Sequence, residues 1–132
     1  MVKLVFFDLD EREQGVVRGA FARESGYDIA MHPESLTNEN ASLARDADGI
    51  GIFVASHATK KALDRMPNLK LIAAMSTGFD NIDVDACRER NIAICNVPSY
   101  GANTVAEYAF GLILALARNF RPMFERTARG DF

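Results

Sequence analysis

The chain has 132 residues, a formal net charge of −3 at pH 7, 48% hydrophobic residues and 25% charged residues. This length and composition are typical of one globular domain with a substantial core. The slight negative charge gives no reason to expect a nucleic acid or an anionic membrane as partner. A predicted strand begins directly after the first residues without a signal peptide, and the most apolar segment, residues 105–117, is too short to span a bilayer. We therefore expect a cytoplasmic protein.

Apolar runs alternate with helical patterns along most of the chain. Strands are predicted at residues 4–7, 27–31, 50–54, 69–75 and 92–97, and helices at residues 11–24, 41–47, 59–66 and 83–90. Uninterrupted apolar runs are typical of strands that are buried on both faces, as in parallel sheets. The alternation predicts an α/β fold, with an open, parallel, five-stranded, flavodoxin-like sheet in the order 2-1-3-4-5 and helices on both faces.

Capping patterns mark the starts of two helices, the first predicted helix and a long helix near the end of the chain. Asp10 followed by Glu13 predicts a capping box at the first helix. Thr104 followed by Glu107 predicts a second box, which opens a long helix toward residue 119. This helix is apolar nearly all round between residues 105 and 117, and such a helix needs cover on most of its surface. We predict that it folds back onto the sheet or pairs with another copy.

Ligands of open parallel sheets bind outside the carboxyl ends of the strands. In the strand-end loop of residues 76–80, Gly78 allows a tight turn, and the N–H groups of Thr77 and Gly78 could hold a carboxylate. The alternative is an ordinary turn in which Asp80 bonds its own backbone. In the next such loop, Tyr100 either overhangs the same crevice or packs as a partly buried side chain.

Other reactive side chains point to structural roles. His32 is expected to be solvated, and His57, in a strand-end loop, has a surface role as its simplest interpretation. Cys87 and Cys95 have no further Cys or His at ligand spacing. They indicate buried or half-buried thiols rather than a disulfide or a metal site. The sequence therefore predicts no metal ligands.

Three motifs occur together in the second half of the chain: STGFDNID from residue 76, NVPSY from residue 96 and NTVAE from residue 103. At these spacings they resemble the substrate-binding domain of the NAD-dependent D-2-hydroxyacid dehydrogenases. The resemblance is strongest over residues 48–132, and residues 117–132 look most like D-lactate dehydrogenases. It implies that residues 1–102 form a substrate domain. It also implies that residues 103–132 form an interdomain and dimer-interface helix region, which would lead into an NAD-binding domain.

The resemblance also implies roles for five residues. The backbone of Thr77 and Gly78 would hold the carboxylate of a 2-oxo acid, and Phe53 would form an aromatic wall. Tyr100 matches a substrate-side tyrosine, and Val105 matches a position near the nicotinamide of the cofactor.

The resemblance places the catalytic Arg, Glu and His of the family, and its glycine-rich phosphate turn, in a part that would follow Phe132. The one GxG pattern, residues 49–51, lies inside a predicted strand and lacks the third glycine of a dinucleotide fingerprint. We therefore expect no catalytic residue and no bound NAD in this chain, although the full-length parent would use NAD. The expected partners are a weakly bound 2-oxo acid, the NAD-binding domain and a second copy through the helix of residues 104–119.

Two other classes of function remain open. Asp8 and Asp10 resemble the strand-end DxD of haloacid-dehalogenase-type phosphatases, in which the first Asp attacks phosphate and both bind Mg²⁺. Glu11 and Arg12 depart from that pattern, and helix capping also explains Asp10. The second alternative is a non-enzymatic flavodoxin-like module, either a receiver-type domain or a flavin binder. The matching Thr and Lys of receiver domains are not evident.

Overall fold

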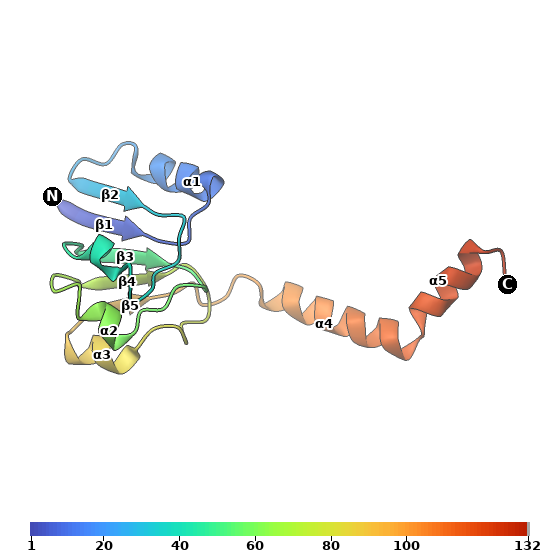
Figure 1. Cartoon of the computed structure of the whole chain (residues 1–132). Coiled ribbons are helices and arrows are strands. Elements are labelled where there is room, and N and C mark those ends of the chain that lie inside the picture. Colours follow the sequence, from blue (N-terminus) through green and yellow to red (C-terminus); the bar gives the residue numbers. More distant parts are fainter. Residues whose placement is uncertain (132) are drawn as a thin grey trace. The chain divides into compact units, whose positions relative to one another are not determined.

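The computed structural model describes residues 1–131 (Figure 1). Its sheet consists of β1 (Val2–Phe6), β2 (Tyr27–Met31), β3 (Gly49–Ile52), β4 (Leu71–Ala74) and β5 (Ala93–Cys95). All neighbouring strands are parallel, and their order is β2-β1-β3-β4-β5. The predicted fold class and strand order are therefore confirmed.

The helices are α1 (Glu11–Phe21), the 3-10 helix η1 (Ala41–Ala44), α2 (Lys60–Leu63), α3 (Val84–Glu89), α4 (Ala102–Ala117) and α5 (Phe120–Ala128). The four that connect the strands, α1 to α3 and η1, are shorter than the sequence pattern predicts. The helix predicted at residues 41–47 is a single 3-10 turn, and α1 ends three residues before the predicted boundary. Helix ends are the least determined part of a sequence pattern because the last turn lacks its own hydrogen bonds.

Of the two predicted capping boxes, one is present. Asp10 Oδ1 accepts from the N–H of Glu13 at 2.8 Å, and Glu13 Oε2 accepts from the N–H of Asp10 at 2.9 Å. The box predicted at Thr104 and Glu107 is wrong, because α4 begins earlier, with Gly101 as its N-cap and without a side-chain cap. Thr104 therefore lies inside the first turn rather than at its start.

The hydrophobic core lies between the sheet and η1, α2 and α3. Alternate residues of the strands point to this face and are buried, among them Val5, Ile50, Ile52, Ile72 and Ala74. They pack with buried residues of the helices and loops, including Leu36, Ala44, Leu63, Met66 and Cys87. Full burial of a large aliphatic side chain contributes about 1.5–3 kcal/mol, so this face supplies most of the stability of the sheet.

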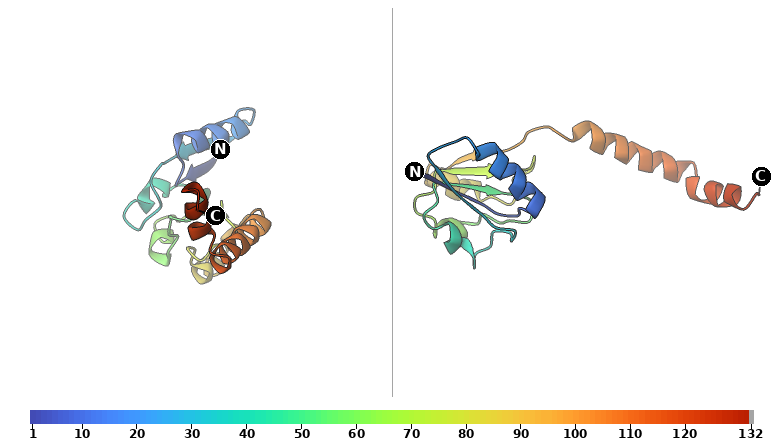
Figure 2. Two further views of the ribbon diagram at one scale, coloured as in Figure 1. Left: turned by 90° about the vertical axis from the view of Figure 1, so that its right-hand side faces the viewer. Right: turned by 90° about the horizontal axis from the view of Figure 1, so that it is seen from above.

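The opposite face of the sheet is covered by α1, which lies across the strands from η1 and α2 (Figure 2). The rings of Phe6 and Phe21 are 6.4 Å apart there. No residue of α1 is fully buried, and Val16 is 69% exposed although it is apolar. Toward the edge strand β5 this face is open, since Leu71 is partly exposed and Cys95 is exposed.

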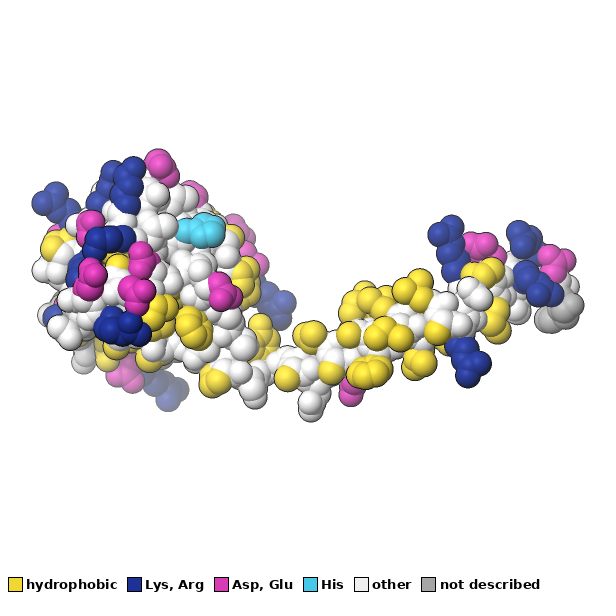
Figure 3. All heavy atoms as spheres, turned by 90° about the horizontal axis from the view of Figure 1, so that it is seen from below, with side chains coloured by type: hydrophobic (Ala, Val, Ile, Leu, Met, Phe, Trp, Pro, Cys, Tyr) yellow, Lys and Arg dark blue, Asp and Glu magenta, His cyan; other side chains and the backbone are white. Residues whose placement is uncertain are grey.

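Two compact units divide the chain, Met1–Pro98 and a second that begins at Ser99. All the buried residues of the described chain belong to the first unit. In the second unit α4 and α5 contain no buried residue, and Asn119, in the left-handed conformation (φ 52°), separates them. Figure 3 shows hydrophobic side chains along this helical segment. None of the helices in residues 1–131 has the length and hydrophobicity needed to cross a bilayer.

Candidate functional site

The loop after β1 binds the loop after β3 through one carboxylate. Asp8 has a left-handed backbone (φ 61°), and its Oδ2 accepts from the N–H of Phe53 at 3.0 Å and from Ser56 Oγ at 2.5 Å. The hydroxyl of Ser56 is buried and accepts in turn from the N–H of Leu36 at 2.7 Å. These hydrogen bonds account for the Asp8 carboxylate, and helix capping accounts for the Asp10 carboxylate. Neither role requires a nucleophile. They give no support to the phosphatase alternative.

Asn81 holds the same loop from another direction. Its Nδ2 donates to the carbonyl oxygens of Phe53 at 3.0 Å and of Ser56 at 2.7 Å. The N–H of Ser56 also bonds the carbonyl of Phe53 at 3.3 Å, which closes a turn. The backbone N–H and C=O of Phe53 are therefore both bonded to side chains of other loops, and the residue is held at the carboxyl end of β3.

Side chains also fix the loop that contains Thr77 and Gly78. Thr77 Oγ1 donates to the carbonyl of Val97 at 2.8 Å, and Asn96 Nδ2 donates to the carbonyl of Thr77 at 2.8 Å. Ser76 Oγ donates to the carbonyl of Gly78 at 2.8 Å. Within residues 1–131 the N–H groups of Thr77 and Gly78 donate to no other group of the protein. Two backbone donors in a fixed loop are therefore available to an anion.

A pocket of about 230 Å³ lies next to these loops, at the carboxyl ends of β1, β3 and β4. It is lined by Asp8, Leu9, Glu13, Val16, Val17, Phe53 and Met75. The two carboxylates of this lining already accept hydrogen bonds from the protein, Asp8 from the β3 loop and Glu13 from the N-terminus of α1. The rest of the lining is apolar and suits a small apolar group.

The first unit contains three of the five predicted site residues. Phe53 is half-buried in the pocket wall, and Thr77 and Gly78 follow Met75 of the same pocket. Tyr100 and Val105 belong to the second unit, where they are 71% and 69% exposed.

The histidines and cysteines lie outside this pocket. His57 is exposed, whereas His32 is half-buried and stacks on Phe7 with ring centroids 5.3 Å apart. The prediction of a solvated His32 is therefore wrong, because the Phe7 ring covers one face of the imidazole. Cys87 and Cys95 are both free thiols, the first buried and the second exposed. Burial raises the pKa of the Cys87 thiol. Cys95 was expected to be at least half-buried, but it lies on the open side of the edge strand.

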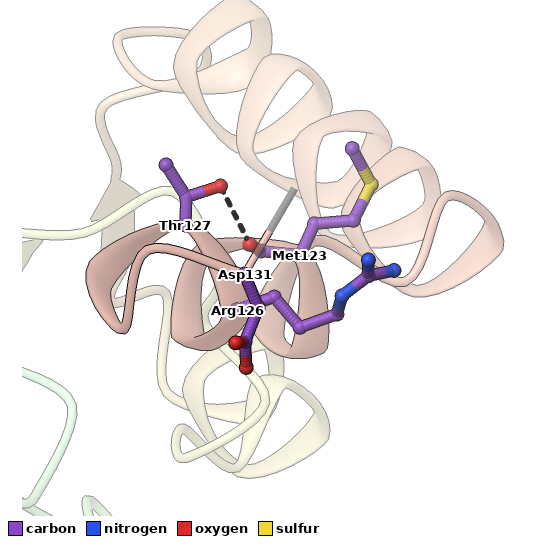
Figure 4. Close-up of a pocket in the computed structure, with 4 residues that line it drawn as sticks. All are labelled: Met123, Arg126, Thr127 and Asp131. Carbon is purple, nitrogen blue, oxygen red and sulfur yellow. Dashed lines mark hydrogen bonds between the residues drawn. The ribbon is translucent and has the colours of Figure 1, made fainter.

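Two other observations narrow the search for a site. In the described part of the chain, no three His, Cys, Asp or Glu side chains are grouped so that they could hold a metal ion. A hollow on α5 is lined by Met123, Arg126, Thr127 and Asp131 (Figure 4). Its polar groups serve the helix end: Thr127 Oγ1 donates to the carbonyl of Met123 at 3.0 Å, and Asp131 pairs with Arg129 at 3.5 Å. This hollow is therefore part of a helix terminus.

Three residues of the site, Asp8, Ser56 and Asn81, were not identified as loop clamps from the sequence. The available signal was positional, since each is a short polar side chain in a loop that follows a strand. Such side chains are suited to bonding nearby backbone groups. Which backbone they bond depends on the strand order, which brings residues 45 and 48 positions apart into contact.

Comparison with known proteins identifies the family of this chain. The profile of the D-isomer specific 2-hydroxyacid dehydrogenases, catalytic domain, matches residues 4–129. The chain belongs to this family. The resemblance based on the three motifs is thereby confirmed.

Individual members of the family show the extent of the match. A 2-hydroxyacid dehydrogenase homolog of Zymomonas mobilis is 37% identical over 81% of this chain and 33% of its own length. An aromatic 2-oxoacid reductase of Clostridium sporogenes is 32% identical over 85% of this chain and 34% of its own length. The structure of the Aquifex aeolicus D-lactate dehydrogenase, complexed with NAD and lactic acid, superposes with a TM-score of 0.84 at 27% identity. The superposition covers 98% of this chain and 38% of the Aquifex chain. The chain thus spans about a third of the length of these relatives.

Proposed function

We propose that this chain is the substrate-binding part of an NAD-dependent D-2-hydroxyacid dehydrogenase, which in full length reduces a 2-oxo acid with NADH. The observation that carries the proposal is the pair of unoccupied N–H donors at Thr77 and Gly78, beside an apolar pocket walled by Phe53. Membership of the family and the similarity to an NAD-bound D-lactate dehydrogenase support it.

In this proposal the chain binds and orients the acid. The N–H groups of Thr77 and Gly78 hold the carboxylate, because hydrogen bonds to an ionised acceptor are about twice as strong as neutral ones. The side chain of the acid enters the pocket against Phe53, which excludes water from that side. NAD supplies the hydride chemistry when it is bound. No residue of the pocket is placed in a proton-transfer role, since both carboxylates are engaged in internal hydrogen bonds.

The lining of the pocket favours an apolar side chain on the acid. Leu9, Val17 and Met75 offer no hydrogen-bonding group to a polar substituent, and the Asp8 carboxylate would repel a second carboxylate. Pyruvate, whose reduction gives D-lactate, is the smallest 2-oxo acid with an apolar side chain. We infer that 2-oxo acids with longer apolar chains also fit, which agrees with the name of the Clostridium relative, an aromatic 2-oxoacid reductase.

In this proposal the second unit contacts the substrate, the cofactor and other protein surfaces. Tyr100 would face the substrate, and Val105 would lie near the nicotinamide in the full-length protein. The apolar surface of α4, which includes Phe110 and Leu116, would be covered by the NAD-binding domain and by a second copy across a dimer interface. Exposed apolar patches of this kind mark interaction sites.

The test is a titration of the isotope-labelled chain with pyruvate, followed by the NMR shifts of backbone amides. We expect the largest shifts at the amides of Thr77 and Gly78, with saturation in the millimolar range. Methyl pyruvate is the matched control, because it keeps the shape of the ligand and lacks the carboxylate charge. Equal shifts with acid and ester, or shifts that leave Thr77 and Gly78 unmoved, would contradict the proposed carboxylate site.

A further inference from the structure

One side chain joins the two halves of the proposed site. Asn81 lies in the loop that contains Thr77 and Gly78, and its amide bonds the loop that contains Phe53. Both bonds come from the same nitrogen, to carbonyl oxygens three residues apart in the turn that follows β3. The loop that would hold the carboxylate is thereby tied to the wall that would meet the side chain.

The chemistry of Asn81 suits this bridging position. A side-chain amide has two N–H donors on one nitrogen, and here each has a carbonyl acceptor. Asp has the same shape but lacks both donors, and its charge would face the two carbonyl oxygens. The far side of the turn is fixed independently by Asp8, which accepts from the N–H of Phe53, and by the buried Ser56. Backbone bonds also join the two loops farther along, from the N–H of Ala58 to the carbonyl of Asn81 at 2.9 Å and from the N–H of Asp83 to the carbonyl of Ala58 at 3.0 Å. Loss of the Asn81 amide bonds would therefore change the spacing at the Phe53 end of the turn, which the Asp8 contacts alone would then hold.

We propose that Asn81 is a positioning residue that sets the distance between the carboxylate-binding N–H groups and the Phe53 wall, and thereby the preferred length of the substrate side chain. This inference rests on the proposed function. An acid that is anchored at Thr77 and Gly78 reaches Phe53 only when its side chain matches that distance. Pyruvate, with a single methyl group, depends little on the wall, whereas 4-methyl-2-oxopentanoate depends on it strongly.

The test compares the dissociation constants of these two acids by NMR titration of the wild-type chain and of N81D. We expect N81D to lower the preference for 4-methyl-2-oxopentanoate over pyruvate by about tenfold, the effect of losing roughly two buried methylene groups. The matched control is N40D. Asn40 also donates its amide to a backbone carbonyl, that of Ser35 at 2.9 Å, in a loop that does not line the pocket. N40D should keep the wild-type preference.

A purely structural role for Asn81 predicts a different result. If N81D weakens the binding of both acids by the same factor, the ratio of their dissociation constants stays at the wild-type value. This result would overturn the inference while the proposed function stands. A wild-type chain that binds neither acid overturns both. If N81D fails to fold, N81Q answers the question, because it keeps both donors on a longer side chain. We expect N81Q to change the preferred side-chain length, and an unchanged preference in N81Q would overturn the inference.

Discussion

The two units of the chain use apolar residues in different ways. In α2, a helix of only four residues, Ala62 and Leu63 are fully buried against the sheet. In α4, a helix of sixteen residues with mostly apolar side chains, none is buried. Apolar content alone therefore does not make a core. A stripe on one face indicates packing within the unit, whereas apolar residues all round a helix indicate that it needs further partners.

The sharpest test of this comparison is a pair of Phe truncations. Phe7 is fully buried and Phe110 is 66% exposed. We expect Phe7→Ala to lower the free energy of unfolding of the first unit by about 3–5 kcal/mol, because it leaves a cavity in the core. Phe110→Ala should change that free energy by less than about 0.5 kcal/mol. Urea unfolding followed by circular dichroism measures both. A comparable loss in Phe110→Ala would show that α4 stabilises the first unit.

Alanine substitutions at two glycines, one in each unit, should change stability by smaller amounts and in opposite directions. A Cβ at Gly51 would lie 2.3 Å from Cδ1 of Phe6, whereas a Cβ at Gly111 would meet nothing within 4 Å. We expect Gly51→Ala to destabilise the first unit by about 1–3 kcal/mol through overpacking. Gly111→Ala should stabilise α4 by about 0.5–1 kcal/mol, because alanine is the better helix former.

Unfolding midpoints report the change at Gly51, and helical ellipticity reports the change at Gly111. Loss of helix in Gly111→Ala would mean that α4 already packs closely at this position. A neutral Gly51→Ala would mean that the ring of Phe6 moves aside without cost.

The smallest expected effect is electrostatic and belongs to the first unit. Hydrogen bonds from the Lys70 ammonium at 2.8 Å and from the Lys3 N–H at 3.0 Å lower the pKa of Asp48 below its usual value. A carboxyl whose pKa is lower in the folded state stabilises the fold above its unfolded pKa, and this contribution is lost as the pH falls through the folded pKa. The free energy of unfolding should therefore decline below about pH 4.

Asp48→Asn should flatten part of this decline when unfolding is followed between pH 2 and pH 7, a range set by the usual carboxyl pKa of about 4. The control Asp85→Asn removes the same charge from an exposed pair with Arg88. An acid limb that is identical in Asp48→Asn and in the wild type would assign the decline to other carboxyls.

The sheet could be predicted from the sequence because each buried strand is a separate apolar run. The boundaries were less accurate: β2 matches the predicted range, whereas β5 is shorter than predicted. The failed capping box at Thr104 has a specific cause, since Ser/Thr–x–x–Glu is also compatible with the interior of a first turn. Val16 is exposed for a different reason. The half-buried residues of α1 form a narrow stripe through Gln14, Val17 and Phe21, and Val16 lies outside it.

The residues of the site also divide into those that a local sequence pattern predicts and those that depend on long-range contacts. The free donors of Thr77 and Gly78 follow from a local feature, a glycine in a turn after a strand, and Phe53 was found only through the family resemblance. The clamps at Asp8 and Asn81 depend on contacts between residues 45 and 28 positions apart. No local pattern encodes such contacts, because they exist only after the sheet has formed.

The left-handed backbone of Asp8 has a consequence for the sequences that this fold can accept. A φ of 61° is tolerated by glycine, asparagine and aspartate and disfavours other residues. The turn after β3 needs, in addition, a side-chain oxygen at that place to receive the N–H of Phe53 and the hydroxyl of Ser56. Glycine meets the first requirement and fails the second, while glutamate fails the first. Only aspartate and asparagine therefore meet both requirements, so the geometry of the two loops restricts this position to these two residues.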